Sequence, residues 1–285
     1  DLENFDFSKT DICLMSAGSS VSKEWSPKIG AKGCLVIDNS SCWRYDPEVP
    51  LVVPEVNAHV LADYMARPNR RNIIANPNCS TAQLVVVLKP LHDVTPIVRV
   101  IASTYQAASG AGAAAMQELE DSTRAYLNGE KFEPKVLPHP YAFNLFSHNA
   151  GMNVVTGYNG EEEKVMKEVK KIMRTPEMRV GITCIRVPVL RAHAESLNIE
   201  FAAPLPVEKA RAALAVFPGV RLVDDRERNY FPMPVDSSGG DDVLVGRIRE
   251  DLSDPSGKTL ALFLSGDQLR KGAALNAVQI AQRIW

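Results

Sequence analysis

The chain has 285 residues, 45% of them hydrophobic, with 32 basic and 34 acidic residues. This length allows two domains with a sizeable core, and the balanced charge excludes the basic surface that nucleic-acid binding requires. No apolar stretch approaches the length of a membrane span, so we expect no membrane partner. The five cysteines are scattered without CxxC spacing, which argues against a zinc site or a disulfide framework and for a reducing, intracellular compartment.

Short apolar runs alternate with amphipathic segments in the first part of the chain. Residues 11–15 and 34–38 predict buried strands, and residues 21–29 between them predict a helix. Two further apolar runs, 51–54 and 72–75, extend the pattern. Strand, helix and strand at this spacing indicate βαβ units in a parallel sheet.

The turn after the first predicted strand, Ser16-Ala17-Gly18, consists of small residues and opens a helix. Such a turn lets backbone N–H groups approach an anion such as a pyrophosphate. Tight βα turns commonly use Gly and Ser without any ligand. On these residues alone, the interpretation as a plain turn is the stronger one.

The most informative stretch is Asn76-Pro77-Asn78-Cys79-Ser80-Thr81, which joins an apolar run to a helix-like run over 82–88. A strand-to-helix turn here places Cys79 at a helix N-terminus, where unpaired N–H groups favour a thiolate. A thiolate is the nucleophile that covalent catalysis needs. A small buried residue without a catalytic role explains this stretch equally well.

The second part of the chain has longer predicted strands and fewer connecting helices. The strands are expected over 97–105, 180–189, 196–201 and 243–248, and the helices over residues up to 124, 161–174 and 272–285. A loop is expected at 109–112. This pattern indicates a mixed or antiparallel sheet packed on helices, as in an α+β domain.

The run from Arg186 to Glu195 interrupts β character with Pro188, two arginines and His193. A histidine titrates near neutral pH and can act as a general acid or base. Arg186 can bind a carboxylate through two parallel hydrogen bonds. An exposed edge strand with a structural histidine is the stronger interpretation of this run by itself.

Two further charged positions are candidates for anion or substrate contacts. Glu161 and Lys164 lie three residues apart on a predicted helix and share a face, although most such pairs only keep a helix soluble. Arg44 follows a strand and can hold an anion, or can stack on Trp43 or Tyr45.

Together these segments resemble the aspartate-β-semialdehyde dehydrogenase family over nearly the whole chain. The segments that carry the resemblance are 16–18, 44–46, 52–57, 76–81, 103–112, 186–189 with His193, and 266–274. The stretches 141–149 and 192–196 are most similar to the plant and algal form of the enzyme.

The resemblance implies an α/β fold with an incomplete Rossmann-like parallel sheet and an α+β catalytic and dimerisation domain with a large mixed sheet. Residues 1–78 and 267–285 are expected to form the NADP-binding domain, and residues 79–266 the catalytic and dimerisation domain. The family begins with a strand and a Gly-rich turn. Nothing similar occurs before Asp11, so we expect the N-terminal Gly-rich βαβ unit to be missing.

The resemblance also assigns roles to residues. The nucleophile falls on Cys79 and the acid/base on His193. Substrate contacts fall on Gln106, Arg186 and Glu161, with Glu162 and Glu163 as alternatives to Glu161. Phosphate contacts fall on Arg44 and Lys164; cofactor contacts fall on Ser16, Ala17, Gly18, Ser109, Gly110 and Gln268. No metal is expected.

The activity implied is NADP-dependent reductive dephosphorylation of L-4-aspartyl phosphate to L-aspartate 4-semialdehyde through a cysteine thioester, in lysine, threonine and methionine biosynthesis. Inorganic phosphate is a substrate of the reverse reaction. A homodimer or homotetramer is expected, in the plastid stroma for a plant or algal chain and otherwise in the cytoplasm. The alternatives are an enzyme similar to N-acetyl-γ-glutamyl-phosphate reductase and a catalytically silent dimerising fragment.

Overall fold

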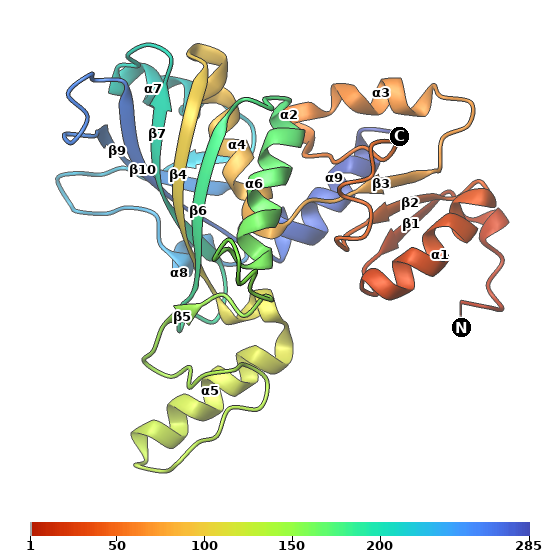
Figure 1. Ribbon diagram of the computed structural model, residues 1–285, viewed down its shortest axis with the longest axis horizontal. Coiled ribbons are helices and arrows are strands. Elements are labelled where there is room, and N and C mark those ends of the chain that lie inside the picture. Colours follow the sequence, from red (N-terminus) through yellow and green to blue (C-terminus); the bar gives the residue numbers. More distant parts are fainter. Residues whose placement is uncertain (1) are drawn as a thin grey trace.

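The computed structural model describes residues 2–285, which form two sheets with helices packed around them (Figure 1). The smaller sheet has three parallel strands in the order β1 (Ile12–Met15), β2 (Leu35–Asp38) and β3 (Ile73–Ala75). The helix α1 (Ser19–Ala31) connects β1 to β2. The predicted βαβ arrangement is therefore confirmed.

The larger sheet has seven strands and is mixed, as predicted. In spatial order the strands are β5 (Phe146–Ser147), β6 (Arg179–Arg186), β4 (Ile97–Gln106), β7 (His193–Phe201), β10 (Thr259–Gly266), β9 (Val243–Glu250) and β8 (Val220–Leu222). β4 runs parallel to β6, and β8 runs parallel to β9. The other neighbouring strands are antiparallel.

Three helices cover one face of the larger sheet: α4 (Cys79–Val94), α6 (Gly160–Met173) and α7 (Val207–Ala215). Figure 1 shows α4 and α6 between this sheet and the smaller one. The other face is partly exposed: Ile101 of β4 has 39% of its surface accessible, and Tyr105 lies 6.1 Å from Phe263 between ring centroids.

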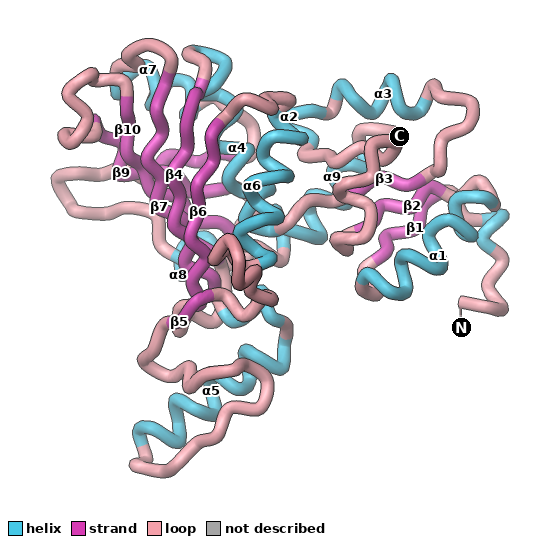
Figure 2. Tube along the Cα trace, viewed as in Figure 1, coloured by secondary structure: helices cyan, strands magenta, loops and turns pink. Residues whose placement is uncertain are grey.

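The remaining elements are short or peripheral. They are α2 (Pro54–Asn57), α3 (His59–Met65), α5 (Ala113–Leu127), α8 (Pro234–Ser237), α9 (Leu275–Gln282), the 3-10 turns Phe7–Lys9 and Ala108–Ala111, and a π-helical turn Arg270–Ala274. The chain between α5 and α6 is mostly loop (Figure 2). Residues of α9 pack with β2, α3 and β3 in a common apolar cluster, so the C-terminal helix joins the smaller sheet.

Some predicted boundaries differ from the structure. In the predicted run 51–54 only Leu51 pairs, through a bridge to Ala75, because Pro54 begins α2. The strand predicted to reach residue 189 ends at Arg186, before Pro188. The strand β10 was not predicted, because an unbroken apolar run fits a buried strand and a buried helix equally well.

Candidate active site

Cys79 is the first residue of α4, as the sequence predicts. The Asn78 side chain caps this helix by accepting hydrogen bonds from the N–H groups of Ser80, at 3.0 Å, and Thr81, at 3.2 Å. Asparagine is common at this cap position because its side-chain oxygen accepts hydrogen bonds from backbone N–H groups that have no partner within the helix. The short stretch after β3 therefore fixes the position of the cysteine.

A cavity of about 400 Å³ opens over Cys79. Nine of the residues assigned by resemblance line it: Arg44, Cys79, Gln106, Ser109, Gly110, Glu161, Lys164, Arg186 and Gln268. They come from widely separated parts of the sequence. Sequence reasoning gave no role to several other lining residues, among them Asn39, Asn76, His148 and Gly272.

The strand order of the larger sheet explains this convergence. Gln106 and Arg186 are the last residues of the parallel strands β4 and β6 and lie opposite each other in register. β7 runs in the reverse direction, so its first residue, His193, lies at the same end of the sheet. One edge of the sheet thus collects an amide, a guanidinium and an imidazole.

His193 is fully buried and lies behind the cavity wall. Its Nδ1 accepts a hydrogen bond from the Ala107 N–H at 3.0 Å, which places the ring proton of the neutral form on Nε2. Within residues 2–285, Nε2 has no hydrogen-bond partner. A Cβ added to Gly110, a cavity-lining residue, would lie 2.9 Å from Nε2. Glycine at position 110 therefore leaves room for the imidazole, with which a side chain would collide.

Burial and the positive charge of Arg186, opposed by Glu161, together lower the pKa of His193 to about 3. The imidazole is therefore neutral across the physiological range. In this tautomer it presents a hydrogen-bond donor at Nε2, which suits an oxygen that gains negative charge.

The surroundings of Cys79 contradict the expectation of a thiolate at this position. Burial and the nearby Glu161 charge together raise the pKa of the Cys79 thiol to about 12. Arg186, Arg44 and the Ser80 N–H act in the opposite direction but are outweighed. Desolvation disfavours the charged form more than the helix N-terminus favours it, so the protein by itself holds a neutral thiol.

Arg186 is only 2% exposed and is fixed by three protein acceptors. Its Nη1 donates to the Ala107 carbonyl at 3.0 Å, its Nε to Asn149 Oδ1 at 3.2 Å, and its Nη2 to His148 Nε2 at 2.8 Å. A guanidinium carries five N–H groups. Each terminal nitrogen therefore keeps one further N–H for a ligand.

Among the three consecutive glutamates, Glu161 is the one that lines the cavity. It accepts from Asn78 Nδ2 at 2.7 Å and lies 3.4 Å from Lys164 Nζ. Burial acts to raise its pKa, but His148, Lys164 and Asn78 outweigh this effect and lower it. Glu162 instead accepts from two backbone N–H groups, and Glu163 pairs with Lys167.

Arg44 lines the cavity but is largely engaged with the protein. It donates to the carbonyl groups of Asn76 and Asn39 and forms an ion pair with Glu168 at 3.1 Å. The cations that lie over Trp43 and Tyr45 are Arg71 and Lys167, so Arg44 does not take the predicted stacking role.

Sequence reasoning missed Glu168, a fully buried residue of α6. Besides its ion pair with Arg44, it accepts from the Asn78 N–H at 2.6 Å. It therefore connects the turn before Cys79 to Arg44. The signal was present, because Glu168 lies seven residues after Glu161 and two helical turns bring it to the same face.

The turn Ser16–Gly18 lies at the carboxyl edge of the smaller sheet, outside the lining of the Cys79 cavity. Ser16 Oγ is 3.5 Å from Asn39 Nδ2, and Asn39 lines the cavity. The N-terminus of α1 has no side-chain cap, and a Cβ at Gly18 would meet nothing within 4 Å. Uncapped N–H groups beside open space fit the phosphates of a dinucleotide.

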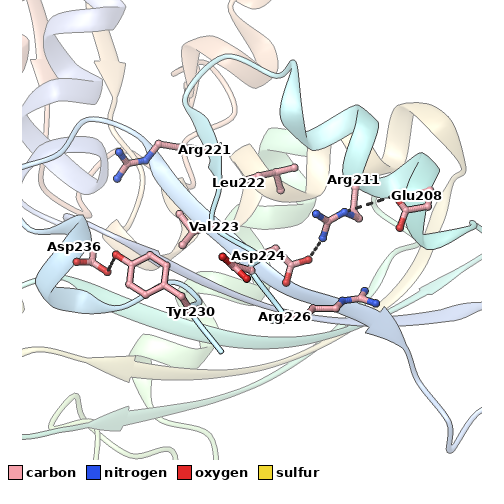
Figure 3. A pocket seen from close by; sticks show the side chains of 10 residues that line it. Glu208, Arg211, Arg221, Leu222, Val223, Asp224, Arg226, Tyr230 and Asp236 are labelled. Carbon is pink, nitrogen blue, oxygen red and sulfur yellow. Dashed lines mark hydrogen bonds and ion pairs between the residues drawn. The ribbon is translucent and has the colours of Figure 1, made fainter. Parts of the chain in front are cut away.

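A larger cavity, about 810 Å³, lies beside β8 and contains none of the predicted site residues (Figure 3). Its charged groups pair largely with one another: Arg211 with Asp224 and Glu208, and Tyr230 with Asp236. Volume alone therefore does not locate the chemistry. No helix within residues 2–285 is long and apolar enough to cross a bilayer. Across the same residues, no cluster of three or more His, Cys, Asp or Glu is arranged to hold a metal ion.

Comparison with known proteins finds matches in one enzyme family. The family model of the semialdehyde dehydrogenase NAD-binding domain matches residues 1–64, and that of the semialdehyde dehydrogenase dimerisation domain matches residues 88–271. Aspartate-semialdehyde dehydrogenase of Synechocystis is 52% identical over 97% of the chain and 79% of its own length.

Solved structures give the same result. The crystal structure of aspartate semialdehyde dehydrogenase II from Vibrio cholerae complexed with ASA has a TM-score of 0.94 and 42% identity, covering 100% of this chain and 82% of that one. The Candida albicans enzyme with NADP has a TM-score of 0.73 and 26% identity, covering 96% and 77%. With both family models matching in order along the chain and a relative 52% identical over 97% of it, the chain belongs to the aspartate-semialdehyde dehydrogenase family of oxidoreductases.

Proposed function

We propose that the chain interconverts L-4-aspartyl phosphate and L-aspartate 4-semialdehyde, with Cys79 as the nucleophile. The observation that carries this proposal is the single cavity in which Cys79 meets Arg186, Glu161 and Lys164. A cationic guanidinium, a carboxylate and an ammonium match the α-carboxylate, the α-ammonium and the phosphate of the two reactants.

In the oxidative direction, the Cys79 sulfur bonds to the aldehyde carbon and the thiol proton passes to the carbonyl oxygen. His193 Nε2 donates a hydrogen bond to this oxygen and stabilises the negative charge that develops on it before the proton arrives. NADP would supply the hydride acceptor for this carbon. Loss of the hydride and of the hydroxyl proton would convert the Cys79 adduct into an acyl thioester. An oxygen of inorganic phosphate then attacks the thioester carbon, and the C–S bond breaks as sulfur regains a proton.

Substrate contacts fall to three side chains in this proposal. Arg186 binds the α-carboxylate with the N–H groups that the protein leaves free, and Gln106 lies beside it at the end of β4. Glu161 binds the α-ammonium, because its lowered pKa keeps the carboxylate charged. An N-acetylated substrate has no ammonium, and this disfavours the acetylglutamyl-phosphate alternative.

Lys164 and Arg44 bind the phosphate. Lys164 is the freer of the two, with its side chain 33% exposed. Both cations have a carboxylate partner, Glu168 for Arg44 and Glu161 for Lys164. Ser109, Gly110 and Gln268, which line the cavity, and the turn Ser16, Ala17 and Gly18 would hold the NADP. Gln268 donates to Ser109 and accepts from the Ala192 N–H, which ties these loops together.

The test is turnover of L-aspartate 4-semialdehyde with phosphate and NADP, followed by NADPH absorbance. The Cys79→Ser variant is expected to lose at least about 10³-fold in kcat, because a serine hydroxyl here lacks an activating base. Without phosphate, the parent enzyme is expected to accumulate an acyl adduct on Cys79, seen by peptide mass spectrometry. Full activity of the serine variant contradicts the nucleophile assignment.

Parallel assays separate the alternatives. Faster turnover of N-acetylglutamate semialdehyde supports the acetylated substrate, and equal kcat/KM with NAD and NADP argues against NADP preference. No heat of NADPH binding by calorimetry supports a silent fragment.

We also propose a homodimer or homotetramer in which a second subunit covers the partly exposed sheet face around Ile101 and Phe263. The domain model that matches residues 88–271 describes a dimerisation domain. All five cysteines are unpaired, which supports a reducing compartment: the plastid stroma for the plant or algal form of the family, and otherwise the cytoplasm. Light scattering gives the assembly state directly.

A further inference from the structure

His148 lies where the substrate cavity meets the segment that follows β5. The two residues of β5 pair with Arg186 and Ile185 of β6, and the His148 N–H continues this pairing by donating to the Cys184 carbonyl at 2.9 Å. The backbone therefore holds the ring beside the end of β6. The imidazole is partly buried and lines the same cavity as Cys79.

The ring contacts Arg186 directly. His148 Nε2 lies 2.8 Å from Arg186 Nη2, and because a guanidinium has only donors, the histidine nitrogen is the acceptor. The other ring nitrogen, Nδ1, lies 3.2 Å from the Ala150 N–H. A neutral imidazole accepts at one nitrogen at a time. The shorter contact to a charged donor takes precedence, which assigns the proton to Nδ1.

The neighbouring Asn149 contributes the second acceptor on the same guanidinium, at Nε. Two consecutive side chains thus hold Arg186 from one side, while the Ala107 carbonyl holds Nη1. This arrangement fixes the plane of the guanidinium. Bidentate carboxylate recognition depends on that plane as well as on the charge.

We propose that His148 is a positioning residue, which orients the Arg186 guanidinium for the α-carboxylate of the substrate. This inference rests on the proposed carboxylate-binding role of Arg186. The contact requires a neutral ring, because a protonated imidazole has no acceptor and adds a positive charge beside Arg186.

Burial favours the neutral form of the ring. Burial lowers the pKa of His148 to about 4; Glu161 of α6 opposes this shift, whereas Arg186 of β6 and Lys164 of α6 reinforce it. The ring of His193 on β7 also interacts electrostatically with His148. At neutral pH the acceptor is therefore available to Arg186.

The decisive experiment compares two aldehydes, L-aspartate 4-semialdehyde and its decarboxylated analogue 3-aminopropanal, with His148→Ala, His148→Leu and His148→Gln. The Ala and Leu variants remove the acceptor. We expect kcat/KM for the semialdehyde to fall on the order of 10-fold or more, mainly through KM, as for loss of a hydrogen bond to a charged group. For 3-aminopropanal, kcat/KM is expected to stay within about 3-fold of the parent value.

The Gln variant retains a side-chain acceptor and is expected to keep most of the semialdehyde activity. It also keeps the test valid if the smaller substitutions do not fold. His139→Ala is the matched control, since it removes an exposed histidine from the same loop that contacts Phe146. We expect this control to leave both substrates unaffected.

Arg186→Gln separates the two levels of the proposal. If this variant loses activity equally on both aldehydes, the carboxylate role of Arg186 is wrong and the proposed function needs revision. If Arg186→Gln discriminates between them but the His148 variants lower activity equally on both, or on neither, the positioning role of His148 alone is overturned.

Discussion

Individual side chains in the cavity take their chemical state from burial more than from local sequence. Cys79 occupies the helix N-terminus that normally favours a thiolate, yet burial raises its pKa to about 12. His193 likewise has its pKa lowered to about 3 by burial. In the proposed reaction, a neutral thiol and a neutral imidazole donor imply that the sulfur loses its proton as it attacks.

Gly110 offers a test at the level of a single atom. A Cβ at this position would lie 2.8 Å from His193 Cε1 and 3.1 Å from Arg186 Nη1. Gly110→Ala is therefore expected to displace one or both groups and lower kcat/KM on the order of 10- to 100-fold, because small misplacements of catalytic groups are costly. Steady-state kinetics measure this loss, and thermal melting checks the fold.

The control for Gly110→Ala is Gly151→Ala, where an added Cβ meets nothing within 4 Å and the backbone is not left-handed. It is expected to retain activity. If Gly110→Ala keeps the kcat/KM of the parent enzyme, the close packing inferred between Gly110 and His193 is wrong.

At the scale of elements, the site depends on how the C-terminal segment packs against the start of α4. The π-helical turn Arg270–Ala274 precedes α9 and contacts α4. Within it, Lys271 is buried and bonds to Glu55, Asn276 and Gln279. These contacts hold a segment that lies almost 200 residues later in the sequence against the turn that contains Cys79.

Gly272 is the residue of closest approach in this packing. A Cβ there would lie 2.8 Å from Cys79 Cβ, 3.0 Å from its Cα and 3.2 Å from its carbonyl oxygen. Since two of these atoms belong to the backbone, Gly272→Ala is expected to destabilise the fold by about 1–3 kcal/mol, the usual cost of overpacking. Urea denaturation measures the change, and activity should fall with it.

Gly160→Ala, in the helix α6, is the control for this substitution. The nearest atoms to a Cβ added at Gly160 would be 3.7 Å away, which is an ordinary van der Waals contact. A stability change no larger in Gly272→Ala than in this control would contradict the tight packing inferred for the turn before α9.

At the scale of the whole molecule, the two sheets are joined through α4, α6 and α9, and the cavity lies at this junction. We propose that residues 1–78 and 267–285 form the cofactor domain and residues 79–266 the catalytic domain. The packing of α9 on the smaller sheet supports this division. The reaction would then take place where the nucleotide and the acyl substrate approach from different domains.

Global stability is expected to depend on pH through the buried histidines. The unfolded-state pKa of histidine is about 6.5, whereas His193 and His148 have folded-state values of about 3 and about 4. The unfolded chain binds more protons below pH 6.5, so stability falls as pH decreases from there. Each group contributes a slope approaching about 1.4 kcal/mol per pH unit.

Urea denaturation at about pH 7, 6 and 5 tests this dependence, with His148→Gln expected to show a shallower loss than the parent. The exposed His59 provides the control through His59→Gln. If the free energy of unfolding falls equally with pH in the parent and both variants, His148 does not contribute to the pH dependence of stability as predicted.

The sequence by itself determined the family, both sheet types and the start of α4. Ordered motifs from Ser16 to Ala274 are local signals, and Pro77-Asn78 before an apolar run defines a helix start without tertiary information. Only the tertiary structure decided the protonation states of Cys79 and His193, the choice of Glu161 over its neighbours, and the contact between His148 and Arg186. These depend on burial and on strand pairing between distant segments, which no local pattern encodes.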